Sequence, residues 1–119
     1  MESDRFDFEK LHVYWKAIEF ADQVFVMTDG FPQRLQYSVG DQFRRAALSV
    51  CNNLAEGSQK HGAAKRQFYG YALDSARECV PMLELARRRA LIVDARHDQF
   101  RQQCVEICKM LYGLIRKIQ

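Results

Sequence analysis

Residues 41–59 of this 119-residue chain read DQFRRAALSVCNNLAEGSQ and carry two parallel rows of side chains. The apolar row has the spacing of one face of an α-helix, and it comprises Phe43, Ala47, Val50 and Leu54. A polar row runs beside it at the same spacing, and it comprises Gln42, Arg45, Ser49, Asn53 and Glu56. The segment therefore predicts an amphipathic helix with a polar stripe next to its buried face.

The same spacing recurs on both sides of this helix and predicts three more helices. The first ends near TDGFP, where Gly30 favours a cap and Pro32 cannot continue the helix, and residues 31–38 form a short connection. The third is expected over residues 63–90, with Pro81 kinking it or breaking its hydrogen-bond ladder, and the fourth follows LIVDARHD. Because short connections make neighbouring helices antiparallel, we predict one domain over residues 1–119, an all-α, up-down-up-down four-helix bundle.

Two residues mark the expected ends of the helix over residues 41–59. Ser38 and Asp41 read as a capping pair at its start, although Asp41 alone is an alternative cap. Gly57 is expected to supply a left-handed cap where the helix stops, before the turn SQKHG.

Composition is that of an ordinary globular protein, with 48% hydrophobic and 28% charged residues. No apolar run approaches the roughly 20 residues of a membrane-spanning helix, and the polar start MESDRFDFEK is unlike a secretory signal. We therefore expect a cytoplasmic protein without a membrane partner. Its four cysteines lie at apolar helical positions and are expected to be buried, reduced thiols: Cys51, Cys79, Cys104 and Cys108.

The sequence does not predict an enzyme. His12, His61 and His97 are scattered, without a carboxylate or nucleophile at a telling spacing. There is no phosphate-binding glycine loop, no nucleophile elbow and no Glu-x-x-His pair. Cys104 and Cys108 have no second pair of ligands at zinc-site spacing, so we expect no metal, no cofactor and no small-molecule substrate.

Several segments carry a family resemblance. FEKLHVYWKA (8–17) and FPQRLQYSVGDQFRRAALSVCNNLAEGS (31–58) resemble the four-helix-bundle proteins encoded in intervening sequences of bacterial large-subunit ribosomal RNA. The positions that match the family pattern are Gln42, Arg44, Arg45, Ala46, Ser49, Asn53, Ala55, Glu56 and Gly57, followed by Ala72, Ser75 and Glu78. The chain departs from the pattern at Leu35, Asp74, Cys79 and Pro81.

The resemblance implies an oligomeric assembly and does not imply a particular biochemical activity. Members of the family look like ring-forming oligomers, with a pentamer the best guess, and their biochemical role is largely unassigned. The related accessory proteins of diversity-generating retroelements have a similar bundle, are pentameric, and bind nucleic acid and a reverse transcriptase. Carrying that function over rests on fold similarity alone.

The polar stripe predicts a network between the second and third helices. In an antiparallel pair that turns near residue 60, Arg45 lies within about one turn of Glu78, so we predict that they pair. Gln42, Ser49 and Ser75 would complete a hydrogen-bonded layer that fixes the register. A ligand site along the stripe and a solvated surface are the alternatives. Near the helix end, Asn53 accompanies Glu56, whose charge Lys60, Lys65 or a cation of a neighbouring subunit would offset.

The topology gathers arginines at one end of the bundle, which we call the arginine end. Its cations are Arg34, Arg44, Arg45, Arg87, Arg88, Arg89, Arg96 and Arg101, and its anions are Asp29, Asp41, Asp94 and Asp98. The helix dipole also favours arginines in the last turn of any helix, so the run RRRA need not bind a ligand. Five copies in a ring would carry a net charge of about +15, which suits phosphate binding.

Together with the arginine end, the resemblance implies a ring-forming, sequence-independent RNA- or DNA-binding accessory protein, and a homo-oligomeric scaffold without nucleic-acid affinity is the alternative. Besides Arg44, Arg87, Arg88, Arg89, Arg96 and Arg101, candidate nucleic-acid contacts at the opposite end are Lys60, Lys65 and Arg66. Tyr69 and Tyr71 lie near them and could stack on bases, but Tyr69 fits the core better. The wide apolar surface is either buried within one chain or packs, with Tyr14, Trp15 and Tyr71, against other copies.

Overall fold

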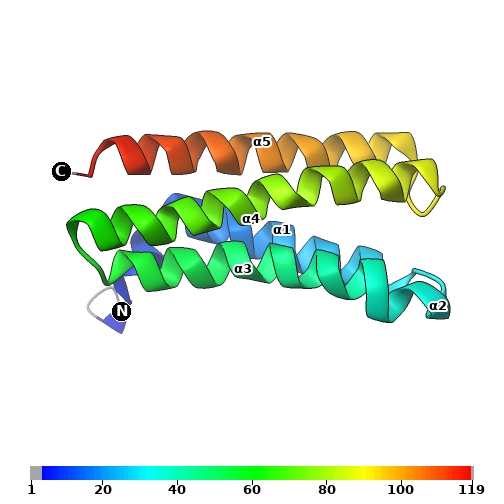
Figure 1. The fold of residues 1–119 in the computed structure, drawn as a ribbon, viewed down its shortest axis with the longest axis horizontal. Helices are drawn as coiled ribbons and strands as arrows, with labels where there is room; N and C mark the ends of the chain where they lie inside the picture. Colours follow the sequence, from blue (N-terminus) through cyan, green and yellow to red (C-terminus); the bar gives the residue numbers. More distant parts are fainter. Residues whose placement is uncertain (1–3, 119) are drawn as a thin grey trace.

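The computed structural model describes residues 4–118 and confirms the predicted four-helix bundle (Figure 1). Its long helices are α1 (His12–Asp29), α3 (Asp41–Ser58), α4 (Gly62–Arg88) and α5 (Asp94–Arg116). Consecutive long helices run in opposite directions, and each packs against the next, while α1 also contacts α5. The described residues contain no strand.

The core is built from the apolar rows that the sequence shows. Phe43 and Leu54 of α3 and Leu83 of α4 are completely buried. Phe20 of α1 and Phe100 of α5 are also buried, and their rings meet edge to face with centroids 5.9 Å apart. Because each helix presents an apolar stripe at helical spacing, one continuous core forms along the bundle axis.

A short 3-10 helix, η2 (Asp7–Lys10), precedes α1 and packs against α1 and α3. The Trp15 indole donates a 2.9 Å hydrogen bond to the Glu9 carbonyl, and the Tyr14 ring contacts both Phe8 and Trp15. Trp15 remains 46% exposed. The wide apolar surface of α1 is therefore covered in part by the chain's own N-terminal segment.

The connection between α1 and α3 is helical, which the sequence did not predict. It consists of α2 (Gln33–Leu35) and a π-helical turn, η3 (Gln36–Gly40), that continues directly into α3. The predicted capping pair is wrong, because Gly40 before Asp41 is itself helical and leaves no free helix start to cap. The Ser38 hydroxyl instead donates to the Leu35 carbonyl at 3.4 Å.

Gly57 does not cap α3, so that prediction is also wrong. The helix continues through Gly57 to Ser58, and the positive φ angles of the described chain occur at Gly62 and Ala90. A Cβ on Gly57 would lie 2.7 Å from Cδ1 of Tyr69 and 3.1 Å from Cβ of Phe68. Glycine is therefore needed there because α3 and α4 approach each other closely.

Helix α4 runs unbroken through Pro81, so the proline removes one hydrogen bond of the ladder, as expected, without ending the helix. Pro81 is exposed, and so is Arg77, one turn earlier, whose carbonyl the proline cannot bond. Water can satisfy a carbonyl at an exposed position, so the helix tolerates the lost hydrogen bond there. The helix ends at Arg88, two residues before the predicted end.

Candidate nucleic-acid interface

The arginine end lies where α1 and α4 end and where α3 and α5 begin, at the right of Figure 1. The α2–η3 connection and the turn between α4 and α5 close this end of the bundle. The fold thus brings together arginines that are far apart in the sequence. Their partners differ, and these differences decide which charges remain available to a ligand.

Glu84 neutralises part of the RRRA run. Its carboxylate accepts hydrogen bonds from Arg87 and, at 2.9 Å, from Nε of Arg88. Arg87 also lies 3.9 Å from Asp94, and Nε2 of His97 lies 3.7 Å from Glu84. The sequence analysis missed Glu84, although it stands three and four residues before its two arginines, a spacing at which helical side chains meet.

The Glu84 cluster predicts a specific acid dependence of stability. Hydrogen bonds from Arg87 and Arg88 lower the pKa of Glu84 to about 2, whereas an unfolded glutamate titrates near about 4.3. The stabilisation is therefore complete above about pH 4.3 and is lost as the pH falls towards 2. Glu84→Gln is expected to flatten the pH dependence of the unfolding free energy in this window, measured by urea denaturation.

The matched control is Glu78→Gln, because Glu78 is an exposed glutamate of the same helix with no partner among the contacts of residues 4–118. It should keep the wild-type slope. Identical pH profiles for wild type and Glu84→Gln would show that the Glu84 pairs do not stabilise the fold.

Arg45 pairs within its own helix. Its Nε lies 3.1 Å from Asp41, and its side chain is 79% exposed. The predicted pair of Arg45 with Glu78 is therefore wrong, and Gln42 is likewise exposed rather than part of an inner layer. An i, i+4 ion pair on one helix satisfies Arg45 without a contact across the bundle.

The remaining members of the polar stripe form a smaller network between α3 and α4. The Ser75 hydroxyl donates to the Ser49 hydroxyl at 2.8 Å. The Asn53 amide donates to the carbonyl and the hydroxyl of Ser49, at 2.9 and 3.0 Å. At the helix end, Glu56 pairs with Lys60 at 3.3 Å, which is one of the compensating contacts that the sequence predicts.

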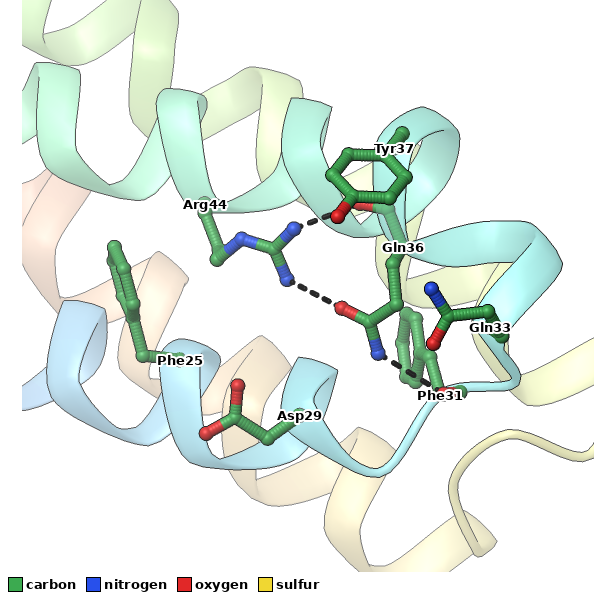
Figure 2. Close-up of a pocket in the computed structure, with 7 residues that line it drawn as sticks. All are labelled: Phe25, Asp29, Phe31, Gln33, Gln36, Tyr37 and Arg44. Carbon is green, nitrogen blue, oxygen red and sulfur yellow. Dashed lines mark hydrogen bonds between the residues drawn. The ribbon is translucent and has the colours of Figure 1, made fainter.

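Arg44 secures the α1–α3 connection and also lines a cavity of about 610 Å³ (Figure 2). Its Nη1 and Nη2 donate to the side-chain and main-chain oxygens of Gln36, at 3.2 and 2.7 Å. The Gln36 amide donates in turn to the carbonyls of Thr28 and Phe31, at 2.8 and 3.0 Å. Gln36 therefore joins the end of α1 to the start of α3, a role that no sequence pattern indicated.

Four arginines of the arginine end are exposed and have no carboxylate partner within residues 4–118: Arg34, Arg89, Arg96 and Arg101. Arg34 and Arg89 line one groove of about 480 Å³ together with Leu35, Val39 and Leu85. The Arg96 guanidinium lies 4.6 Å from the centroid of the Phe100 ring and donates to Gln99. These residues carry the accessible positive charge of this end.

The opposite end also has exposed cations without a carboxylate partner within residues 4–118, namely Arg66, Arg116 and Lys117. Lys60 is paired with Glu56, Arg66 donates to the Ile118 carbonyl at 2.8 Å, and Lys65 lies 6.0 Å from the Tyr69 ring centroid. Tyr69 is buried, as its place in the core pattern predicts, whereas Tyr71 is 44% exposed. Of the candidate contacts Lys60, Lys65 and Arg66, only Lys60 is bound by a carboxylate within residues 4–118.

The thiols lie in the core. Cys51, Cys79 and Cys104 are buried, Cys108 is partly buried, and all four are free. Burial raises the pKa of Cys51 to about 11, and a hydrogen bond with Cys104 together with burial raises the pKa of Cys79. Thiols with raised pKa values are poor nucleophiles at neutral pH.

Residues 4–118 contain neither a candidate metal site nor a helix that could span a membrane. In this range, no group of three or more His, Cys, Asp or Glu side chains is arranged to hold a metal ion. Within the same range, no helix combines the length and the apolar character required to span a membrane.

Comparison with known proteins agrees with the fold and with the resemblance noted above. A crystal structure of a protein of unknown function from the S23 ribosomal protein family of Bacteroides thetaiotaomicron superposes with a TM-score of 0.81. The two chains are 24% identical, and the match covers 88% of this chain and 96% of the other, which shows a shared fold. No curated protein matches the sequence. The model of the 23S rRNA-intervening sequence protein family matches residues 9–113, and the chain belongs to that family.

Proposed function

We propose that this protein is a non-enzymatic, ring-forming accessory protein that binds RNA through its arginine end. The observation that carries the proposal is the group of exposed arginines without a carboxylate partner in the described chain: Arg34, Arg89, Arg96 and Arg101. Guanidinium groups attract phosphates and release the counterions of nucleic acid, whatever its sequence. An RNA-binding role is also consistent with the cytoplasmic location expected from the sequence.

A ring would strengthen binding because it repeats the arginine end around one rim. The pentamer implied by the family resemblance would present five such ends to a single RNA, and linked sites bind with higher avidity than single ones. Exposed apolar side chains are available for contacts between copies; the most exposed on the long helices are Val26, at 68%, and Leu85, at 53%. Trp15 and Tyr71, which the sequence suggested for this role, are 46% and 44% exposed.

The same apolar exposure favours the alternative function, a homo-oligomeric scaffold without affinity for nucleic acid. Two measurements separate the proposals. Light scattering gives the number of copies in the assembly. Fluorescence anisotropy with labelled single-stranded RNA at about 50 and 200 mM salt should show binding that weakens steeply with salt. An oligomer that binds no RNA at about 50 mM salt would support the scaffold.

A pair of charge-matched double variants tests the role of individual arginines. Arg34→Gln/Arg89→Gln removes two cations without carboxylate partners, whereas Arg87→Gln/Arg88→Gln removes two that Glu84 already binds. We expect the first variant to lower the RNA affinity about tenfold and to reduce the salt slope by about 1.4, since each phosphate contact to a single strand contributes about 0.7.

We expect the second variant to change both quantities less, because Arg87 and Arg88 are held by Glu84 and are therefore less available to phosphates. Each variant removes the same formal charge, so a general loss of positive charge would weaken both equally. Equal losses would mean that the pairing with Glu84 does not decide which arginines bind RNA.

A further inference from the structure

One negatively charged carboxylate lies at the arginine end, where most of the charged side chains are positive. Asp29, the last residue of α1, is exposed and lines the cavity of Figure 2. It has no hydrogen-bond or ion-pair partner among residues 4–118. A cavity built only for phosphate would not include a free carboxylate, because the two anions repel each other. A ligand that fits this cavity would therefore offer hydrogen-bond donors to Asp29.

The Arg44 guanidinium, a hydrogen-bond donor, lies on the side of the cavity opposite the Asp29 carboxylate. Figure 2 shows the Asp29 carboxylate on the α1 side of the cavity and the Arg44 guanidinium on the α3 side. Gln36 takes two of the five N–H groups that a guanidinium carries, and it holds the group in place. A fitting ligand presents acceptors to Arg44 and donors to Asp29 at the same time.

Aromatic side chains define the shape of that ligand. Phe25 and Tyr37 also line the cavity, and they are 39% and 85% exposed. An exposed ring on a nucleic-acid surface is a stacking platform for a flat, unpaired base. The carboxylate, the guanidinium and the two rings together describe a site for a nucleobase rather than for the sugar–phosphate backbone.

We propose that this cavity binds an unpaired guanine of the RNA, an inference that rests on the proposed function and names the base that the site selects. Guanine offers O6 and N7 as acceptors to an arginine, and its N1–H and N2–H groups form a donor pair that fits a carboxylate. Uracil has a single N3–H between two carbonyl oxygens, which a carboxylate repels. Adenine and cytosine each offer one exocyclic amino group and no adjacent ring N–H.

The first test uses uridine-rich single-stranded RNAs that differ in one central base. By anisotropy, the RNA with a central guanine is expected to bind about tenfold more tightly than those with adenine, cytosine or uracil. Asp29→Asn should abolish this preference and shift it towards adenine, which an amide binds through two hydrogen bonds. Asp22→Asn is the matched control, since Asp22 is an exposed aspartate of α1 outside the cavity, and it should keep the guanine preference.

Tyr37 provides a second variant for the same assay. Tyr37→Ala is expected to weaken the guanine-containing RNA about tenfold, whereas Tyr37→Phe keeps the ring and the affinity. Because Tyr37 is 85% exposed, its replacement should not affect folding.

A titration with mononucleotides tests the cavity without the rest of the RNA. In NMR spectra, GMP should shift the signals of Gln33 and Gln36, AMP should do so at higher concentration, and Asp29→Asn should remove the difference.

RNA binding without a guanine preference would overturn this inference and leave the proposed function standing. GMP binding without RNA binding would overturn the proposed function and leave the base site standing. Equal binding of GMP and AMP would overturn the base selectivity.

Discussion

Replacing Gln36 by alanine is expected to lower the free energy of unfolding by about 3 kcal/mol. Its amide bonds the carbonyls of Thr28 and Phe31, and its oxygens receive Arg44. Thr28 and Phe31 are themselves buried, at 0% and 5% exposure. Truncation leaves the Phe31 carbonyl and Nη1 of Arg44 without this partner, whereas Nη2 of Arg44 keeps the main-chain oxygen of residue 36 and the Thr28 carbonyl keeps the N–H of Phe31. Each unsatisfied group costs about 1–3 kcal/mol.

Two related variants show whether the amide itself is responsible. Gln33→Ala removes the same kind of side chain at an exposed position three residues earlier. The Gln33 side chain makes no hydrogen bond among the described residues, so we expect little change in stability. Gln36→Glu can still accept from Arg44 but cannot donate to the two carbonyls, so it should lose much of the stability. Urea denaturation measures all three. If Gln36→Ala were as stable as Gln33→Ala, Gln36 would not hold the connection together.

Replacing Gly57 by alanine is expected to lower the free energy of unfolding by about 2 kcal/mol. Inside a helix, glycine to alanine ordinarily raises stability by up to about 1 kcal/mol, so the expected sign is reversed. The reversal follows from packing, because the new Cβ would lie 2.7 and 2.8 Å from two atoms of the Tyr69 ring. Tyr69 is only 3% exposed and has little room to move.

Gly70→Ala is the matched control for this prediction. Gly70 lies inside α4 and a Cβ there would meet no atom within 4 Å, so the variant should gain about 0.5–1 kcal/mol. Gly57→Asn distinguishes close packing from a left-handed cap, which asparagine tolerates. Asparagine should be more damaging than alanine if space is limiting. If it were the milder of the two, the close approach of α3 and α4 would not be the reason for glycine.

The sequence predicts the bundle because its evidence is periodic. Phe43, Leu54, Leu83 and Phe100 stand in rows at helical spacing, and all four are buried as predicted. A row of this kind can be recognised within a single helix. The short connections between the helices then determine their antiparallel order. Errors in single residues, such as the cap expected at Gly57, leave such a pattern intact.

The missed and mistaken details depend on contacts that are not periodic. Gln36 bonds main-chain carbonyls of a connection, so neither charge nor hydropathy marks it. Gly57 resembles a cap because it follows a helical pattern, and only the position of Tyr69, twelve residues later, shows its role. Arg45 has two possible carboxylate partners in the sequence, and the local one, Asp41, forms the pair.

Glu84 is different, since its relation to Arg87 and Arg88 is visible in the sequence as an i, i+3 and i, i+4 pattern. Including it would have shown that the RRRA run is partly neutralised. The candidate interface then shifts from that run to Arg34 and Arg89, which lie more than fifty residues apart in the sequence and meet only because the bundle folds.

The position of bound RNA on the protein tests the account most directly. Photo-cross-linking of single-stranded RNA to the wild-type protein, followed by mass spectrometry of the cross-linked peptides, identifies the contact residues. We predict cross-links in residues 31–45 and 84–101, which form the arginine end. Cross-links confined to residues 59–70 at the opposite end, or none above those of an unrelated basic protein, would contradict it.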